Sequence, residues 1–135
     1  MKNKFPLLLA VMILTAGIVS FNKRSLFIPS SEKNLEVFIA QNKPNNQIAE
    51  AYRFALVNPG KALLQIKCYC GCIKNQGHKN NRDCFIDEDG GIDKMGLNCG
   101  LCVKTALTAK KMLSEGKTVA EISDLVDQKW GGLKE

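Results

Sequence analysis

The residues of this chain best suited to chemistry are its six cysteines and its single histidine, which all fall within one segment. In order, they are Cys68, Cys70, Cys72, His78, Cys84, Cys99 and Cys102. Thiolate and imidazole groups are preferred ligands of soft and borderline metal ions, and thiols also take part in redox exchange. We therefore expect the chemistry of the protein in residues 68–102.

The first three cysteines, Cys68, Cys70 and Cys72, are separated by single residues. In an extended chain, residues two apart point to the same side, so the three thiols could converge on one ion. Gly71 gives the backbone the freedom to bend around such an ion. Cysteines this close are poor disulfide partners for one another, because the bridge needs a specific separation and dihedral angle. The spacing therefore predicts either metal ligands or bridges to distant cysteines.

Cys99 and Cys102 form a C-x-x-C pair at the predicted start of a helix. The helix dipole and the free N–H groups at such a position stabilise a thiolate, so we expect a thiol pKa below the free value of about 8.5. In a redox protein, Cys99 would be the more exposed nucleophile and Cys102 would resolve the mixed disulfide. The surrounding sequence has no βαβ pattern that would support a thioredoxin-like fold.

Three uses of the thiols remain open at this point. All seven residues could bind a metal, most naturally Cu(I), with zinc second because zinc needs a closed set of four ligands. Alternatively, three disulfides could join the first three cysteines to the last three and staple a small exported domain. The third alternative is thiol–disulfide exchange by Cys99 and Cys102. We favour metal binding, because the C-x-C-x-C spacing suits a chelate better than a set of bridges. No hydrolytic arrangement is recognisable, so thiol redox chemistry is the one enzymatic alternative to a non-enzymatic protein.

The flanking segments predict a small all-α domain whose centre is a long cysteine-rich loop, residues 68–98. Apolar residues recur with helical spacing from Asn46, and Asn58-Pro59 ends this helix and starts a short second one. Asn98 is the predicted N-cap of a third helix, which ends at Gly116. Thr118 and Glu121 form a predicted capping box for a fourth helix. Its predicted buried face consists of Val119, Ile122, Leu125, Val126 and Trp130.

The N-terminus is expected to place the domain at a membrane. Phe5 to Phe21 is a run of 17 uncharged residues, at the lower end of the roughly 17–25 needed for a membrane-spanning helix. No good cleavage site follows it, so residues 1–24 are predicted to be a signal-anchor, with a cleaved signal peptide as the alternative. Residues 25–46 would form a tether and residues 47–132 the domain, on the extracytoplasmic side of the cell membrane. Its predicted partners are the membrane and a metal-delivery or acceptor protein.

The net charge of +6 does not indicate nucleic-acid binding. Four of the 19 basic residues, Lys2, Lys4, Lys23 and Arg24, flank the apolar run, and residues 1–30 contain no acid. The remaining 15 basic and 13 acidic residues nearly balance. The positive charge therefore belongs mostly to membrane targeting, and a nucleic-acid partner is excluded.

The cysteine segment resembles the bacterial proteins named for a P-C-Y-C-G-C motif. The resemblance covers about residues 51–130 and is carried by four short stretches, Cys68-Tyr69-Cys70-Gly71-Cys72, Gly77-His78-Lys79, Asp83-Cys84-Phe85 and Cys99-Gly100-Leu101-Cys102. Lys67 stands where the proline of the motif would be. Members of this family are typically exported and membrane-tethered, often as lipoproteins, and their biochemical role is not established. Here the apolar N-terminal segment would replace the lipid anchor.

Overall fold

The computed structural model describes residues 30–132, and its regular elements are helices. They are α1 (Ser30–Asn42), α2 (Asn46–Val57), α3 (Ala62–Gln65), α4 (Cys72–Gln76), α5 (Met95–Asn98), α6 (Gly100–Ser114) and α7 (Val119–Trp130), with 3₁₀ turns η1 (Pro59–Lys61) and η2 (Arg82–Cys84). Within residues 30–132 no strand forms, and Ile86 and Ile92 make an isolated antiparallel bridge. The predicted all-α class is confirmed for this part of the chain. The predicted anchor, residues 1–24, lies outside the described residues.

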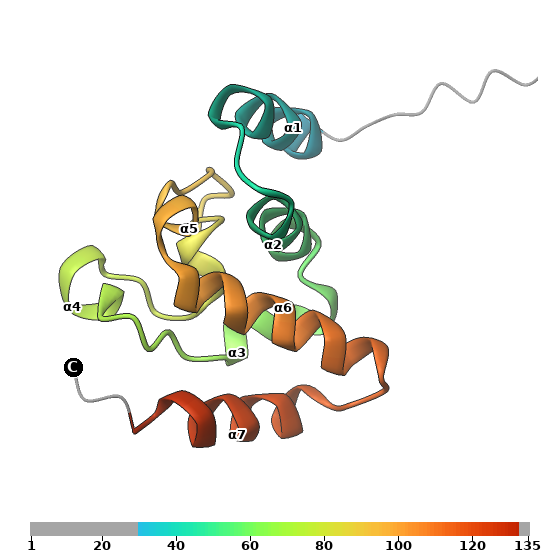
Figure 1. Ribbon diagram of the computed structural model, residues 1–135, viewed down its shortest axis with the longest axis vertical. Helices are drawn as coiled ribbons and strands as arrows, with labels where there is room; N and C mark the ends of the chain where they lie inside the picture. The colour runs from blue at the N-terminus through green and yellow to red at the C-terminus, as the bar shows by residue number, and fades with distance from the viewer. Residues whose placement is uncertain (1–29, 133–135) are drawn as a thin grey trace, which may run out of the picture.

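Helix α6 lies at the centre of the molecule, between α2 on one side and α7 on the other (Figure 1). Helix α1 packs against α2, and the short helix α3 contacts both α6 and α7. Alanines at the α2–α6 contact, including Ala51, Ala55 and Ala106, are fully buried and let the two helices approach closely. No helix between residues 30 and 132 has both the length and the apolar character needed to cross a bilayer.

Local capping signals were good predictors of several helix ends. Asn58 takes the left-handed conformation that ends α2, and its side chain accepts a hydrogen bond from the backbone N–H of Leu63 at 2.8 Å. Pro59 then begins η1. At the start of α7, the Thr118 hydroxyl accepts from the Glu121 N–H, while the Glu121 carboxylate accepts from the Thr118 N–H at 2.8 Å. The predicted capping box is therefore confirmed.

Two details of these helices differ from the prediction. Helix α6 begins at Gly100, and its N-cap is Cys99, whose sulfur accepts from the Cys102 N–H at 3.4 Å. Asn98 is instead the last residue of α5, a turn that the sequence pattern did not reveal. In α7, Ile122 and Val126 are fully buried, whereas Leu125 is 41% exposed because it lies at the edge of the narrow packed stripe.

Residues 30–42, part of the predicted tether, form helix α1 and join the folded body. Its buried residue Leu35 belongs to the core, and the ring of Phe38 lies 5.2 Å from that of Tyr52. Arg53 donates two hydrogen bonds of 2.7 Å to the Glu36 carboxylate. These contacts with α2 thus stabilise α1, whose own sequence has only a weak amphipathic pattern.

The predicted long loop is folded by short turns and side-chain contacts. The Asn81 N–H donates to the Ile66 carbonyl at 2.8 Å, which returns the chain to the end of α3. Phe85 is fully buried and packs edge-on against Tyr52, with ring centroids 5.1 Å apart. Gly96 lies so close to the Phe85 ring that a Cβ would come within 2.5 Å of it. These contacts hold the cysteines of the loop against the first turn of α6.

Candidate metal centre

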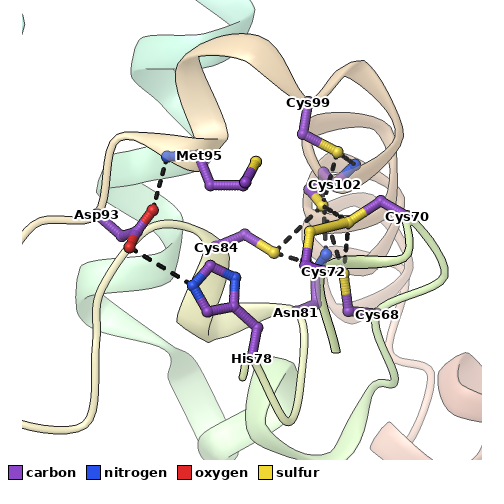
Figure 2. Close-up of a disulfide and its surroundings, with 10 residues drawn as sticks. All are labelled: Cys68, Cys70, Cys72, His78, Asn81, Cys84, Asp93, Met95, Cys99 and Cys102. Carbon is purple, nitrogen blue, oxygen red and sulfur yellow. Dashed lines mark hydrogen bonds and ion pairs between the residues drawn. A yellow bond between two sulfur atoms is a disulfide. The ribbon is translucent and has the colours of Figure 1, made fainter. Parts of the chain in front are cut away.

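Three buried thiols from three separate segments of the chain meet at the N-terminal end of α6 (Figure 2). Cys68 follows α3, Cys84 lies in η2 and Cys102 lies in the first turn of α6. Their sulfur atoms are 3.2–3.5 Å apart in each pair. The residues are 2%, 0% and 1% exposed. We call these three residues the buried trio.

Cys70 and Cys72 lie beside the buried trio and are joined by a disulfide. Together these five cysteines place their sulfur atoms within 4.8 Å of one another. The expectation that cysteines of the C-x-C-x-C run do not bridge one another is wrong. Gly71 has a φ of 78°, and this left-handed turn folds the chain so that the Cα atoms of Cys70 and Cys72 are 5.5 Å apart. The remaining four cysteines are free thiols, so the alternative set of three long-range bridges does not occur in this structure.

Cys99 lies at the rim of the sulfur cluster. Its sulfur is 2.9 Å from that of Cys102, and the residue is partly exposed, as predicted for the first cysteine of the pair. A surface hollow of about 270 Å³ opens beside it and is lined in part by Cys70, Cys72 and Met95. The sulfur cluster is therefore connected to solvent at Cys99.

His78, the predicted nitrogen ligand, is nine-tenths buried beside the thiols but lies outside the set of five. Its Nε2 is 3.5 Å from an Asp93 carboxylate oxygen. Its Nδ1 is buried without a hydrogen-bond partner, on the ring edge nearer the sulfur atoms (Figure 2). Histidines that bind metals commonly donate their second N–H to a carboxylate, which fixes the ring and its tautomer. The arrangement therefore suits a ligand that uses Nδ1.

Asp93 is the residue of this site that sequence reasoning missed. Its second carboxylate oxygen accepts from the Met95 N–H at 2.6 Å, and its carbonyl accepts from the Tyr52 hydroxyl at 2.6 Å. Asp93 is thus held from two sides while it orients His78. No spacing in the sequence pairs residues 78 and 93, because their approach depends on the fold of the intervening loop.

The clustered sulfur atoms change the acidity of the thiols. Hydrogen bonding from Cys102 and then Cys84 lowers the pKa of Cys68 to about 3. The contact with Cys68, followed by those with Cys84 and Cys99, raises the pKa of Cys102 well above the free value. Hydrogen bonding from Cys102 lowers the pKa of Cys99 to about 6. Without a cation, hydrogen bonds from Cys102 therefore stabilise thiolates at Cys68 and Cys99, and a bound cation would displace the remaining protons.

Tyr69 and Lys67 tie the start of the motif to the last helix. The Tyr69 hydroxyl donates to an Asp127 carboxylate oxygen at 2.6 Å, and the Lys67 ammonium lies 3.3 Å from the other oxygen. Tyr69 thus fixes the Cys68–Cys72 segment from outside. Lys67, at the place of the motif's proline, takes part in the same contact.

Comparison with known proteins relates the sequence of this chain to a family. No curated protein and no solved structure matches the chain. The sequence profile described as "Protein of unknown function with PCYCGC motif" matches residues 28–133, which include α1 and all six cysteines. The chain therefore belongs to the family of proteins with a PCYCGC motif.

Proposed function

We propose that this protein binds a soft metal ion through its thiols, takes Cu(I) in preference to zinc, and buffers the ion or hands it on. The observation that carries the proposal is the buried trio, Cys68, Cys84 and Cys102, with sulfur atoms 3.2–3.5 Å apart. With the Cys70–Cys72 bridge reduced, two more sulfur atoms would be available within the same 4.8 Å set. Such a concentration of thiols inside a core is the donor set that soft cations select.

The donor set favours Cu(I) over harder ions. The five clustered ligand atoms are all sulfur, and Cu(I) is the ion that thiolates select when few other donors are present. Zinc needs four ligands, and while the Cys70–Cys72 bridge is present it would recruit His78 through Nδ1, giving a set of three cysteines and one histidine. Zinc is therefore the second candidate, and Asp93 would then support the histidine.

The position of Cys99 supports a role in passing the ion on. Its sulfur is 2.9 Å from Cys102 and reaches the hollow that Met95 also lines. An ion could therefore move from Cys102 to Cys99 and then to a thiol of an acceptor protein by stepwise ligand exchange. We propose that this exchange takes place on the extracytoplasmic side of the cell membrane, with Phe5 to Phe21 as the anchor.

A competition titration tests the proposal. The fully reduced, full-length chain is titrated with Cu(I), and separately with Zn²⁺, against a chelator of known affinity. The Cys68→Ser/Cys84→Ser double variant should lose affinity for Cu(I) by at least about 100-fold, because two of the three buried ligands are removed. Cys99→Ser is the matched control, since Cys99 lies outside the five-sulfur set and should change affinity by less than about threefold.

Two results would count against the proposal. One is a double variant that binds Cu(I) as tightly as the wild type, and the other is weak binding by the wild type itself. Zinc binding that exceeds Cu(I) binding under the same conditions would retain the thiol site but reverse the proposed preference. Far-UV circular dichroism of each variant shows whether the helices are retained.

A further inference from the structure

Cys102 is the junction of the sulfur cluster. Its sulfur lies 3.5 Å from Cys68, 3.4 Å from Cys70, 3.2 Å from Cys84 and 2.9 Å from Cys99. It therefore touches both the Cys70–Cys72 disulfide on one side and the partly exposed Cys99 on the other. A free thiol between a disulfide and a second free thiol has the arrangement that disulfide exchange requires.

We propose that the cysteines form an internal disulfide relay, in which the bridge moves from Cys70–Cys72 to Cys99–Cys102 by way of Cys102. This activity is distinct from metal binding and needs no metal. It would carry the disulfide from the C-x-C-x-C segment to the C-x-x-C pair at the start of α6.

The relay consists of two exchange steps. In the first, Cys102 gives its proton to the Cys68 thiolate, to which it is hydrogen-bonded, and the resulting Cys102 thiolate attacks the Cys70 sulfur. The Cys70–Cys72 bond breaks, and Cys72 leaves as a thiolate that takes up a proton. In the second, the Cys99 thiolate attacks the Cys102 sulfur, the new Cys70–Cys102 bond breaks, and Cys70 leaves and is protonated. Each step forms one S–S bond and breaks one, so the number of disulfides is unchanged and no outside oxidant is consumed.

The contacts of the other sulfur atoms define the path. The cluster neighbours of Cys84 are Cys68 and Cys102, so Cys84 touches neither end of the bridge and lies off the path. Cys68 is 3.1 Å from Cys70 and could form a side branch, but a Cys68–Cys70 bridge would leave Cys99 and Cys102 as thiols. The sulfur neighbour of Cys99 is Cys102, so the route to the C-x-x-C pair runs through Cys102.

The relay also has a consequence for metal binding, and this consequence rests on the proposed function. A bridge between Cys99 and Cys102 removes Cys102 from the buried trio and returns Cys70 and Cys72 to the thiol state. The position of a single disulfide would then decide which thiols can hold an ion.

Peptide mapping of the metal-free, full-length chain tests the relay. Protein with the Cys70–Cys72 bridge is held at about pH 4, where Cys99 and Cys102 are protonated and exchange along this path is slow. It is then brought to about pH 8, quenched at intervals with N-ethylmaleimide, and digested for mass spectrometry. In the wild type, Cys72 should become alkylated while a Cys99–Cys102-linked peptide appears.

Variants separate the two steps. Cys99→Ser should stop the relay after the first step and accumulate a Cys70–Cys102-linked peptide. Cys102→Ser should slow the appearance of alkylated Cys72 by at least about tenfold. Asn75→Ala is the matched control, because this exposed residue lines the same hollow but has no thiol, and it should relay within about twofold of the wild-type rate.

The relay would be overturned if the wild type kept only the Cys70–Cys72 bridge, or if Cys102→Ser exchanged as fast as the wild type. Should Cys102→Ser lose its helical circular dichroism signal, the Cys99→Ser trap decides, because it leaves the buried trio intact. The metal titration uses fully reduced protein, so failure of the relay and failure of the proposed function give different results.

Discussion

The two halves of this molecule are held together by different means. In the helical half, α1, α2, α6 and α7 pack through hydrocarbon side chains, and buried residues such as Ala55 and Ile122 are enclosed completely. In the thiol half, residues 66–98 and the first turn of α6, the interior contains sulfur and polar groups. Three buried polar atoms there have no hydrogen-bond partner, on His78, Asn81 and Asp83, against one in the helical half, Nε1 of Trp130.

The difference indicates which half is adapted for function. A buried polar atom without a partner costs about 1–3 kcal/mol, and native proteins retain few of them. The thiol half combines such atoms with four free thiols, although hydrocarbon residues would pack at lower cost. The predictions below separate the two halves by asking which changes depend on a metal and which do not.

The largest expected effect is stabilisation of the thiol half by Cu(I). At a free ion concentration about 1,000 times Kd, binding should raise the free energy of unfolding by about 4 kcal/mol. Thermal unfolding of the reduced protein with and without Cu(I) measures this, and hydrogen exchange should locate the added protection in residues 66–98. In Cys84→Ser most of the gain should disappear. Equal protection of α2 and the loop would contradict the division into halves.

Shortening a buried side chain in the helical half should lower the free energy of unfolding by the same amount with and without the metal. Ile122→Ala removes a fully buried side chain of α7 and should cost about 2–5 kcal/mol of stability. Urea unfolding of the reduced protein, with and without Cu(I), should give the same loss in both conditions. A loss that appears only with Cu(I) bound would mean that the two halves are coupled more strongly than their contacts suggest.

Asp93→Asn should weaken metal binding while leaving the fold intact. The amide oxygen can still accept from the Met95 N–H, but the carboxylate that orients His78 is lost. In protein that keeps the Cys70–Cys72 bridge, affinity should fall by about 10–100-fold for zinc, which then needs the histidine, and by less for Cu(I). Asp89→Asn, an exposed change in the same loop, is the matched control. Unchanged zinc affinity in Asp93→Asn would show that His78 is not a ligand.

Loss of the α7 cap should affect stability alone. Thr118→Ala removes the hydroxyl that accepts from the Glu121 N–H and should cost about 1 kcal/mol. Its Cu(I) affinity, measured by the competition titration, should match that of the wild type. A change in affinity beyond about threefold would connect α7 to the thiol site.

The smallest effect is expected from Tyr69→Phe, which should cost about 0.5–1 kcal/mol at neutral pH, because the hydrogen bond to Asp127 is partly exposed. That hydrogen bond, followed by the Lys67 contact, lowers the pKa of Asp127 below its ordinary value of 3.8. The stabilisation is therefore complete above about pH 5 and is lost as the pH falls through the lowered pKa. Denaturant unfolding at several pH values should show wild type and variant converging in acid. A difference that grows in acid would be inconsistent with this assignment.

The features that could be predicted from the sequence are those that depend on neighbouring residues. The Thr118–Glu121 capping box and the Asn58-Pro59 helix boundary each lie within a few residues, and the structure contains both. The cysteine order was sufficient to identify the family. Helix α1 was harder to predict, because its stability comes from packing Leu35 against residues outside the helix.

The details of the site could not be predicted, because they depend on how the loop folds. The Cys70–Cys72 bridge follows from the left-handed turn at Gly71, which a list of cysteine spacings does not contain. The pairing of His78 with Asp93 needs the turns between them. The convergence of sulfur atoms on Cys102 needs the packing of that loop on α6. The N-terminal anchor and the choice of metal stay predictions.

X-ray absorption at the copper edge tests the central claim most directly. The reduced, full-length protein is loaded with one equivalent of Cu(I), and the first coordination shell is measured in the wild type and in Cys68→Ser/Cys84→Ser. The account predicts a wild-type shell made mainly of sulfur, at a distance near the 2.3 Å of metal–thiolate bonds, and its loss in the variant. A wild-type shell of nitrogen or oxygen donors, or a sulfur shell that the variant retains unchanged, would contradict it.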